Sequence, residues 1–441
     1  MEGNLKSKTK LISACGNCYE VVKLIGCGGQ GEVYEAVLSS DKKTYALKWY
    51  YKNKATDAQK EILENLISRG SPDKAFLWPS EIVKIASSDA DNNSFGYIMP
   101  LLPDNFKGIV DLMKCRVSPS FNAISRAAFN LTRGFERLHG MGLAYHDISF
   151  GNLFFNPDNG DVLICDNDNV SAPSAVQISV NGTPRFMAPE IVRGEASPSR
   201  NTDLFSLAVL LFYLFMVHHP LEGSAESDIK ALDVYAMEKL YGTNPVFIFD
   251  PDNDTNRPVK GFHDNAVIYW SLYPKQIKDL FAYSFTSGIK LPAKRVTERQ
   301  WMDAIVNMLF GIMQCNCGNE VFYDDDAAQT GSTITCWGCR QELPSPLKLV
   351  FDSDKKKRVL LLRNTKLCSH YVNGEYDLQT VVGSIVRNPK NPNLWGIRNE
   401  SDSNWTYIGN DGASAVVEPG KSALIALGAK IDFGGRAGTF V

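Results

Sequence analysis

The stretch AYHDISFGNLFF, residues 144–155, decides the fold because it places two chemically useful side chains in one short loop. Asp147 and Asn152 lie five residues apart, in a polar segment that follows a helical pattern and enters the apolar run LFF. A carboxylate in such a loop can accept the proton of an attacking hydroxyl, and an amide oxygen can bind Mg²⁺. Asp and Asn are also ordinary loop formers, so the flanking segments must support this interpretation.

A second apolar run downstream, within DVLICDND (161–168), ends at Asp166, fourteen residues after Asn152. This places a second carboxylate where a phosphate-bridging Mg²⁺ can bind, which makes Asn152 and Asp166 candidate magnesium ligands. The run NGTPRFMAPE follows at 181–190. Because these segments occur in one order at consistent spacings, together they carry more weight than any motif alone.

Upstream, the segment GCGGQGEV (Gly26–Val33) lies between two strand-like runs, where glycines let the backbone fold tightly over a polyphosphate. A dinucleotide-binding turn would open a helix, whereas the strand-like EVYEAVL follows here. Lys48 comes fifteen residues after Val33, an offset that lets its ammonium group hold the α and β phosphates. Taken alone, the glycine segment could equally be a structural hairpin, and a lysine at such a position is often an ordinary surface lysine.

The run ATDAQKEILENLISR, residues 55–69, predicts a helix that should provide a carboxylate partner for Lys48. Glu61 and Glu64 both qualify, and Glu64 fits the distance to the following strand better. Strand-like runs on both sides predict a small antiparallel sheet up to about residue 100, and a mainly helical segment follows up to about residue 312. The apolar run at 204–217 is too short for a membrane span and predicts a buried core helix.

The composition is that of a globular chain, with 44% apolar and 22% charged residues, and 441 residues suggest two or three domains. A formal net charge of −3 gives no general attraction to nucleic acid or to an anionic membrane. The first residues lack the apolar core of an export signal. We therefore expect a cytoplasmic protein with reduced thiols that binds neither nucleic acid nor membranes.

Together these motifs resemble the eukaryotic-type (Hanks-type) Ser/Thr protein kinases over about residues 18–312. The resemblance implies an α+β, bilobal fold with a β-rich N-lobe and a helical C-lobe, ATP and Mg²⁺ or Mn²⁺ in the cleft, and a hinge at Pro100–Asp104. It implies that Asp147 and Lys48 are catalytic. The residues implied around the nucleotide are Gly26, Gly28, Gly31, Val33, Lys48, Glu64, the gatekeeper Met99, Leu101, Asn152 and Asp166.

The same resemblance assigns supporting roles in the helical part of the chain. It implies that Thr183 marks Ser/Thr specificity, that Glu190 pairs with Arg295, and that Asp203 anchors the catalytic loop. The activation segment offers candidate phosphorylation sites at Ser171, Ser174 and Ser179.

Three departures from the family pattern define a competing hypothesis. His146 replaces the usual arginine of the loop, Ser149 replaces the usual lysine, and Asp168 ends a motif that normally reads Asp-Phe-Gly. The loss of the arginine predicts a loop that does not wait for phosphorylation. The loss of the lysine leaves the phosphate charge to be neutralised mainly by the metal and Lys48. The alternative function is therefore a pseudokinase scaffold that binds nucleotide and docks partners through its C-terminal β domain.

Four cysteines after the helical segment have the spacing of a zinc ribbon. Cys315 and Cys317 form one knuckle, and Cys336 and Cys339 form a second one after 18 intervening residues. A closed four-thiolate site predicts structural zinc, although the Cys-x-Cys knuckle has a tighter bite than the usual Cys-x-x-Cys. The pair Cys15 and Cys18 has no second knuckle nearby and is interpreted as two ordinary thiols.

Short strand-like runs between turns fill the rest of the chain and predict a small all-β sandwich. Their rhythm resembles forkhead-associated domains, which bind phosphothreonine, but only Ser384 and Arg387 match the expected binding residues. A structural or protein-docking domain is the preferred interpretation. The predicted domains are therefore a kinase domain at 18–312, a zinc-ribbon-like module at 313–344 and a forkhead-associated-like β-sandwich at 346–441.

Residues 242–274 and the Cys-rich tail are similar to a bacterial subgroup of these kinases. Its members accompany a von Willebrand A-like protein and a metal-dependent phosphatase in gene clusters linked to tellurite resistance and stress. The resemblance implies phosphorylation of Ser or Thr on the protein itself or on a partner, with those two proteins as candidate partners.

Overall fold

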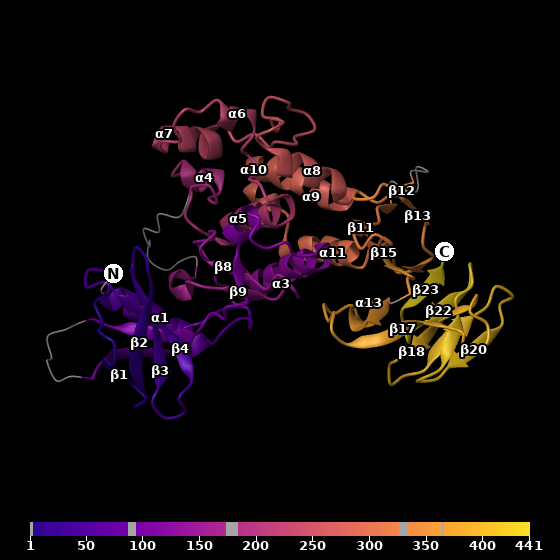
Figure 1. The fold of residues 1–441 in the computed structure, drawn as a ribbon, viewed down its shortest axis with the longest axis horizontal. Helices are drawn as coiled ribbons and strands as arrows, with labels where there is room; N and C mark the ends of the chain where they lie inside the picture. The colour runs from indigo at the N-terminus through magenta and orange to yellow at the C-terminus, as the bar shows by residue number, and fades with distance from the viewer. Residues whose placement is uncertain (1–2, 87–93, 173–183, 326–332, 364) are drawn as a thin grey trace. The chain divides into compact units, whose positions relative to one another are not determined.

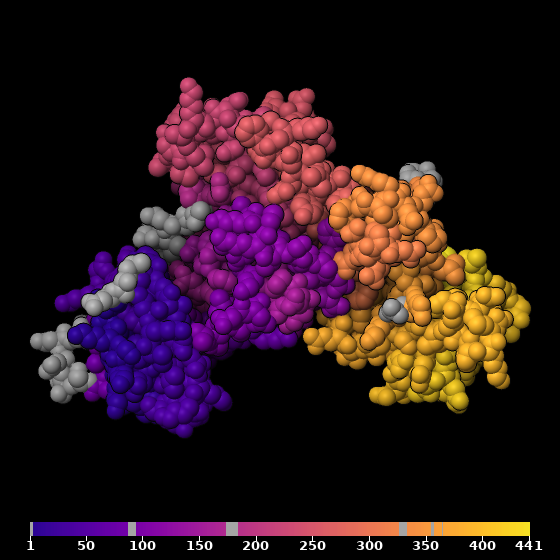
Figure 2. Space-filling view, viewed as in Figure 1, coloured from indigo at the N-terminus to yellow at the C-terminus, as the bar shows by residue number. Residues whose placement is uncertain are grey.

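The computed structural model describes residues 3–86, 94–172, 184–325, 333–363 and 365–441 (Figure 1). Its contacts divide the chain into two compact units, Met1–Asp303 and Ala304–Val441, which are called unit 1 and unit 2. Within unit 1, Figures 1 and 2 show an indigo β-rich lobe beside a magenta helical lobe. The bilobal arrangement expected from the sequence is present.

The β lobe is a closed antiparallel barrel with the strand order β1-β2-β3-β4-β6-β5. The strands are β1 (Lys10–Ser13), β2 (Cys18–Cys27), β3 (Gly31–Leu38), β4 (Thr44–Tyr50), β5 (Glu81–Ile85) and β6 (Gly96–Pro100). The sequence predicted all of these except β1, whose four residues are too few to show a clear alternation. Strand β1 closes the barrel by pairing with both β2 and β5, and its Leu11 is fully buried in the barrel core.

One long helix, α1 (Asp57–Arg69), accompanies the barrel at the place predicted for it. Thr56 caps its first turn by accepting a hydrogen bond from the backbone N–H of Gln59 at 3.2 Å, and Gly70 ends it with φ 74°. Leu63 and Leu66 are buried. These two leucines fix the face that the helix turns toward the rest of unit 1.

The helical lobe is built around α5 (Arg200–Met216), in which every residue from Thr202 to Met216 is buried. Helix α5 contacts α3, α8 and α9, and the ring of Phe212 packs edge-on against Phe281 at 5.0 Å. The apolar run is therefore a core helix, as predicted. No helix in the described ranges combines the length and the apolar character that a membrane crossing requires.

The other helices of this lobe are mostly short. They are α2 (Ile109–Met113), α3 (Phe121–Gly140), α4 (Pro189–Val192), α6 (Ser224–Ser227), α7 (Val234–Met237), α8 (Asp264–Leu272), α9 (Lys275–Phe285), α10 (Ser287–Lys290) and α11 (Glu298–Leu309). Single turns of 3-10 or π type occur at η1 (Asn167–Asn169), η2 (Glu238–Thr243) and η3 (Pro292–Lys294).

A small sheet of three strands, β7-β8-β9, carries the polar loops that the sequence singled out. Its strands are β7 (Lys107–Gly108), β8 (Leu153–Phe155) and β9 (Val162–Ile164). Leu153 pairs with Ile164, so the segment that enters β8 lies beside the segment that leaves β9. This pairing brings the surroundings of Asn152 and Asp166 together although fourteen residues separate them in the sequence.

Unit 2 starts within α11, and two hairpins that carry the four cysteines of the predicted ribbon follow this helix. The hairpins are β10 (Ile312–Gln314) with β11 (Glu320–Phe322), and β12 (Ile334–Thr335) with β13 (Glu342–Leu343). Two larger sheets follow, a six-stranded one ordered β15-β14-β23-β22-β19-β20 and a four-stranded one ordered β16-β17-β18-β21.

The two larger sheets of unit 2 pack against each other. A Cβ atom at Gly383 in the four-stranded sheet would lie 2.9 Å from the Trp405 ring of the six-stranded sheet. Asn399 also donates a hydrogen bond to the Val417 carbonyl of the other sheet at 2.9 Å. Their strands are β14 (Lys348–Phe351), β15 (Asp354–Leu360), β16 (Lys366–Cys368), β17 (Val381–Arg387), β18 (Trp395–Asn399), β19 (Trp405–Ile408), β20 (Ser414–Val417), β21 (Ser422–Leu424), β22 (Lys430–Asp432) and β23 (Ala437–Phe440), with the short helix α13 (Ser369–Asn373) after β16.

Candidate active site

The loop at 145–152 is anchored by the carboxylate of Asp203, which lies in the first turn of α5. Asp203 accepts the backbone N–H of Tyr145 at 2.6 Å and that of His146 at 3.2 Å. The Tyr145 hydroxyl donates to the Cys165 carbonyl, next to Asp166. The anchoring bonds expected for Asp203 are therefore present, and they join the two polar loops through buried groups.

Asp147 and Asn152 lie together in this loop. The Asn152 side-chain amide donates to the backbone carbonyl of Asp147 at 2.8 Å, which fixes the turn between them. Burial raises the pKa of Asp147, while the hydrogen bond from Asn152 and the charge of Lys48 oppose that rise. A carboxyl whose pKa is raised toward neutral pH is a better proton acceptor than an ordinary surface aspartate.

Lys48 lies on β4 and is only 5% exposed. Its ammonium group contacts Asp166, reaches Asp168 at 2.9 Å and donates to the Gln30 side chain at 3.1 Å. Burial lowers the pKa of Lys48, but Asp168 and Asp166 outweigh it, so the pKa is raised and the charged form is favoured. The structure thus brings the predicted lysine and the predicted metal-binding aspartate into direct contact.

Asp166 has a left-handed backbone with φ 59° and ψ 46° immediately after β9. Burial and the neighbouring Asp168 raise the pKa of Asp166, against the opposing effect of Lys48. Asp166 and Asn152 offer a carboxylate and an amide, the oxygen ligands that Mg²⁺ prefers. The chemistry of this donor set therefore fits a magnesium ion.

The predicted partner of Lys48 on helix α1 is wrong for both alternatives. Glu64 is exposed and pairs with Lys60 on the same helix at 3.5 Å, and Glu61 is exposed as well. The physical reason is the rotation of α1 about its axis. The burial of Leu63 and Leu66 sets this rotation, and both glutamates then point to solvent.

Three residues that the sequence analysis did not assign to the site occupy the space instead. Gln59 of α1 donates to the backbone carbonyl of Asp168 at 3.0 Å and to the Tyr50 hydroxyl at 3.3 Å. Tyr50 in turn donates to the Asp168 carboxylate. A signal for Gln59 was present, because it lies four residues before Leu63 and seven before Leu66, on the apolar face. Asp168 was noted only as a departure from the family pattern.

The glycine segment leads into β3, which pairs with β4, the strand that carries Lys48. The segment turns between β2 and β3, and the N–H of Gly28 donates to the Gly31 carbonyl at 2.8 Å. Gly26 pairs with Val33 across the two strands. Val33, Met99 and Leu101 all belong to one apolar cluster, in which Met99 is buried and the other two are partly buried.

The predicted pair between Glu190 and Arg295 is confirmed. Both nitrogens of the Arg295 fork donate to the Glu190 carboxylate at 2.8 Å, and both side chains are buried. Such a bidentate pair fixes α4 against the end of the helical lobe. Ser171 is described and buried, whereas Ser174, Ser179, Gly182 and Thr183 lie outside the described residues.

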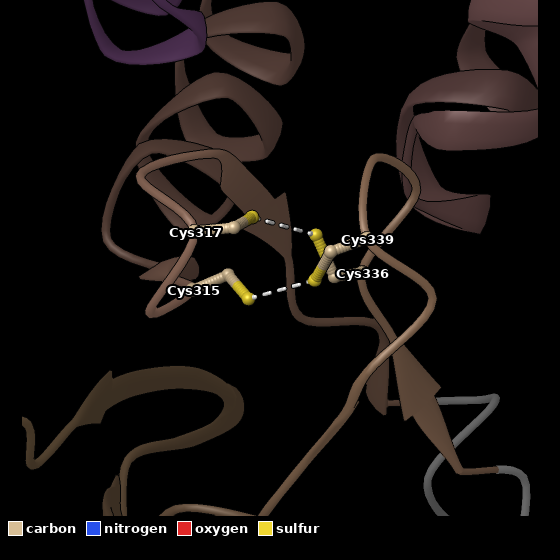
Figure 3. Close-up of side chains that lie close together, drawn as sticks. All are labelled: Cys315, Cys317, Cys336 and Cys339. Carbon is tan, nitrogen blue, oxygen red and sulfur yellow. Dashed lines mark hydrogen bonds between the residues drawn. The ribbon is translucent and has the colours of Figure 1, made fainter.

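The four predicted zinc ligands converge in unit 2. Figure 3 shows the thiols of Cys315 and Cys317 pointing toward those of Cys336 and Cys339, which come from the second hairpin. The sulfur atoms of Cys315 and Cys339 are 3.5 Å apart, those of Cys317 and Cys336 are 3.6 Å apart, and all four lie within 4.8 Å of one another. A tetrahedral zinc with Zn–S bonds of about 2.3 Å requires sulfurs about 3.8 Å apart, so the donor set fits zinc.

The two candidate phosphopeptide residues of the sandwich are engaged in other contacts. Ser384 donates to Glu400 at 2.7 Å. Arg387 donates to the Pro392 carbonyl, and its guanidinium lies 5.2 Å from the centre of the Trp395 ring. These contacts favour a structural role for both residues.

Similar proteins were found for the first unit. Residues 19–303 match the family model described as protein kinase domain. The chain is 27% identical over 209 residues to the probable serine/threonine-protein kinase CCRP1 of Zea mays, covering 47% of this chain and 32% of that protein. It is 26% identical over 205 residues to the serine/threonine-protein kinase TIO of Arabidopsis thaliana, covering 46% and 15%. It is 27% identical over 240 residues to beta-adrenergic receptor kinase 1 of Mesocricetus auratus, covering 49% and 31%.

The chain thus spans about a third or less of the length of these relatives. The family model, however, covers well over half of the chain, and its range contains the glycine segment, Lys48 and both polar loops. The chain belongs to the protein kinase family.

Proposed function

We propose that the protein transfers the γ-phosphoryl group of ATP to Ser or Thr residues of itself or of a partner protein. The observation that carries this proposal is that three separate segments of unit 1 bring Lys48, the Asp147–Asn152 loop and Asp166 close together. Lys48 and Asp166 are the groups that hold phosphate and metal in this family, and both lie close to the loop that carries Asp147.

In this proposal Asp147 accepts the proton of the attacking hydroxyl as the bond to phosphorus forms. The raised pKa of its half-buried carboxyl supports the role. Lys48 holds the α and β phosphates through its charge, and Asn152 and Asp166 bind Mg²⁺ or Mn²⁺. The bound cation neutralises charge on the phosphate oxygens. Because Ser149 replaces the usual lysine, Lys48 is the side-chain cation assigned to this charge.

The test is incorporation of labelled phosphate from ATP with Mg²⁺ or Mn²⁺ into the full chain and into a general protein substrate. Asp147→Ala should lower incorporation by about 10²–10⁴-fold, the usual contribution of a positioned base. The matched control is Asp158→Asn, which removes an exposed carboxylate from the turn after β8 and should retain wild-type incorporation. Equal incorporation by wild type and Asp147→Ala would contradict the assignment.

A pseudokinase scaffold is the second candidate function. The specific observations in its favour are Ser149 and the neutral Gln59, which is the α1 residue in contact with Asp168. A scaffold would bind an ATP analogue with Mg²⁺ yet incorporate no phosphate with either cation. Retention of Lys48, Asp147, Asn152 and Asp166 favours the enzyme, because a group that accepts the proton and groups that hold phosphate and metal are the parts that phosphoryl transfer needs most.

We also propose that the four cysteines of unit 2 hold a structural zinc ion. Four thiolates leave no open coordination position, so the site would stabilise the hairpins and take no part in catalysis. The β-sandwich that follows is proposed to be forkhead-associated-like and to serve as a protein-docking module. The proposed domain boundaries are 18–312, 313–344 and 346–441.

The similarity of residues 242–274 and the Cys-rich tail to a bacterial kinase subgroup supports a role in stress signalling. The partners proposed on that ground are a von Willebrand A-like protein as substrate and a metal-dependent phosphatase that reverses the reaction. Phosphorylation of the purified von Willebrand A-like protein by wild type, but not by Asp147→Ala, would support this proposal. No labelling of that protein beyond the mutant level would contradict it.

A further inference from the structure

The starting point is that helix α1 presents no carboxylate to Lys48. Its buried face contains Leu63 and Leu66, and Gln59 lies on the same face, four and seven residues earlier. Glu61 and Glu64 are displaced from Gln59 by two and five positions, which places them well away from this face. Turning either glutamate toward Lys48 would expose the two leucines, so the helix is held in its present phase.

The carboxylate that does meet Lys48 comes from the loop after β9. Asp168 is fully buried, and its carboxylate oxygens lie 2.9 and 3.0 Å from the Lys48 ammonium. The Tyr50 hydroxyl, two residues further along β4, donates to the same carboxylate. Among the described residues, Lys48 is the cation in contact with Asp168. A buried carboxylate with a single cationic neighbour strongly favours keeping that neighbour in place.

Helix α1 still takes part in this arrangement, but through a neutral group. Gln59 donates to the main-chain carbonyl of Asp168, and the same amide contacts the Tyr50 hydroxyl. The helix thus fixes the backbone that carries the carboxylate, while the charge itself sits in the loop. Asp166, the other carboxylate on Lys48, is a proposed metal ligand and its side chain is 35% exposed, so it faces the cleft as well as the lysine.

We infer that Asp168 is a positioning residue that holds Lys48 for the ATP phosphates, taking over the task that a helix glutamate performs elsewhere in this family. In this chain the carboxylate that meets Lys48 comes from the loop, and the helix contributes only the neutral Gln59 to the same cluster. This inference rests on the proposed function, since it concerns the same nucleotide site.

The experiment compares Asp168→Asn, Glu64→Gln, Gln59→Glu and the double variant Asp168→Asn with Gln59→Glu in the full chain. Asp168→Asn keeps the shape of the side chain and removes its charge, and kcat/KM for ATP should fall by about 10²-fold, as expected for a misplaced phosphate contact. Glu64→Gln should retain wild-type kcat/KM. In the double variant, Gln59→Glu should raise kcat/KM again by at least about tenfold. It places a carboxylate on the helix face that contacts Asp168 and Tyr50, whose ring centre lies 5.7 Å from the Lys48 ammonium.

A merely structural role for Asp168 would lower the melting temperature without any rescue of kcat/KM by Gln59→Glu. That result, wild-type activity of Asp168→Asn, or a loss in Glu64→Gln as large as that in Asp168→Asn would each overturn the inference. If Asp168→Asn fails to fold, Glu64→Gln still tests the inference, because a large loss of kcat/KM in that variant would show that Glu64 positions Lys48.

A second readout separates this inference from the proposed function. Affinity for a non-hydrolysable ATP analogue with Mg²⁺ requires Lys48 to be in place but requires no phosphoryl transfer. If wild type transfers no phosphate, the proposed function fails, whereas about tenfold weaker analogue binding by Asp168→Asn and unchanged binding by Glu64→Gln still support the role of Asp168. Equal analogue affinity in all variants would overturn it.

Discussion

At the scale of single residues, the buried side chain of His139 supports the 145–152 loop from a distance. Its ring lies between two carboxylates, contacting Asp203 at 3.1 Å on one side and Glu298 on the other. Arg200 also donates to Glu298, at 2.6 and 3.2 Å. Since Asp203 accepts two backbone N–H groups of the loop, the charge state of His139 bears on the stability of the site.

These groups predict a stability maximum between about pH 4.5 and 6.5. Burial lowers the pKa of His139, but Asp203 and Glu298 outweigh it, so the folded pKa is raised above 6.5. Its contribution is therefore complete below pH 6.5 and is lost as the pH rises through the folded value. Burial alone would raise the pKa of Glu298, but His139 and Arg200 lower it from 4.5 to about 2. The Glu298 contribution is therefore lost as the pH falls from 4.5 toward 2.

The measurement is thermal or urea unfolding of wild type and His139→Gln across this pH range. His139→Gln should cost about 3–5 kcal/mol near pH 6, because it breaks a buried charged network, and the difference should shrink at higher pH. Glu136→Gln removes the surface pair with Arg299 and should cost at most about 1 kcal/mol. A pH-independent difference between wild type and His139→Gln would contradict this role.

At the scale of secondary-structure elements, the glycines of the segment between β2 and β3 differ in how much space a larger side chain would have. A Cβ atom at Gly31 would clash with the carbonyl oxygen of Trp49 on β4 and lie 3.0 Å from the Tyr50 Cα. Gly26 has no atom within 4 Å of the place a Cβ would occupy. Gly31 is therefore required by the close approach of β3 to β4, whereas the space around Gly26 is open.

Gly31→Ala should destabilise unit 1 by about 1–3 kcal/mol, because the clash is with backbone atoms that cannot move without disturbing the barrel. Gly26→Ala should change the stability by less than about 1 kcal/mol. The free energy of unfolding from urea titration tests both expectations. Equal stability of the two variants would show that the β3–β4 contact relaxes freely.

At the scale of the whole molecule, unit 2 contains two small hairpins that have little apolar core of their own. Cys315, Val321 and Cys336 are the buried members of the cluster between them. Hairpins of this size are at best marginally stable in water by themselves, so a metal cross-link between them would add to their stability. The four converging thiols supply the ligands for such a cross-link.

Protein purified without chelator should contain about one zinc per chain. Cys336→Ser, or removal of the metal by a strong chelator, should lower the unfolding temperature of unit 2 in calorimetry. The transition of unit 1 is identified by its upward shift with an ATP analogue. Cys115→Ser changes an exposed thiol of unit 1 and should leave both transitions and the zinc content as in wild type. Absence of zinc from the purified protein would contradict the assignment.

The sequence by itself determined the order of the motifs, and with it much of the fold and of the candidate site. Lys48, Asp147, Asn152 and Asp166 were predicted from their spacing, because distances along one chain limit which strands and loops can carry them. The Glu190–Arg295 pair was predicted from the resemblance and is present. The buried helix α5 was equally clear, because a helix that is apolar on every side must be shielded from water by the rest of the lobe.

The tertiary structure alone decided which carboxylate meets Lys48. Distance along the chain allowed Glu61 or Glu64, but the burial of two leucines set the rotation of α1 and excluded both. Strand β1 likewise could be recognised only from its pairing with β5, which lies some seventy residues later. Contacts between segments distant in the sequence depend on packing, and no local pattern of residues encodes them.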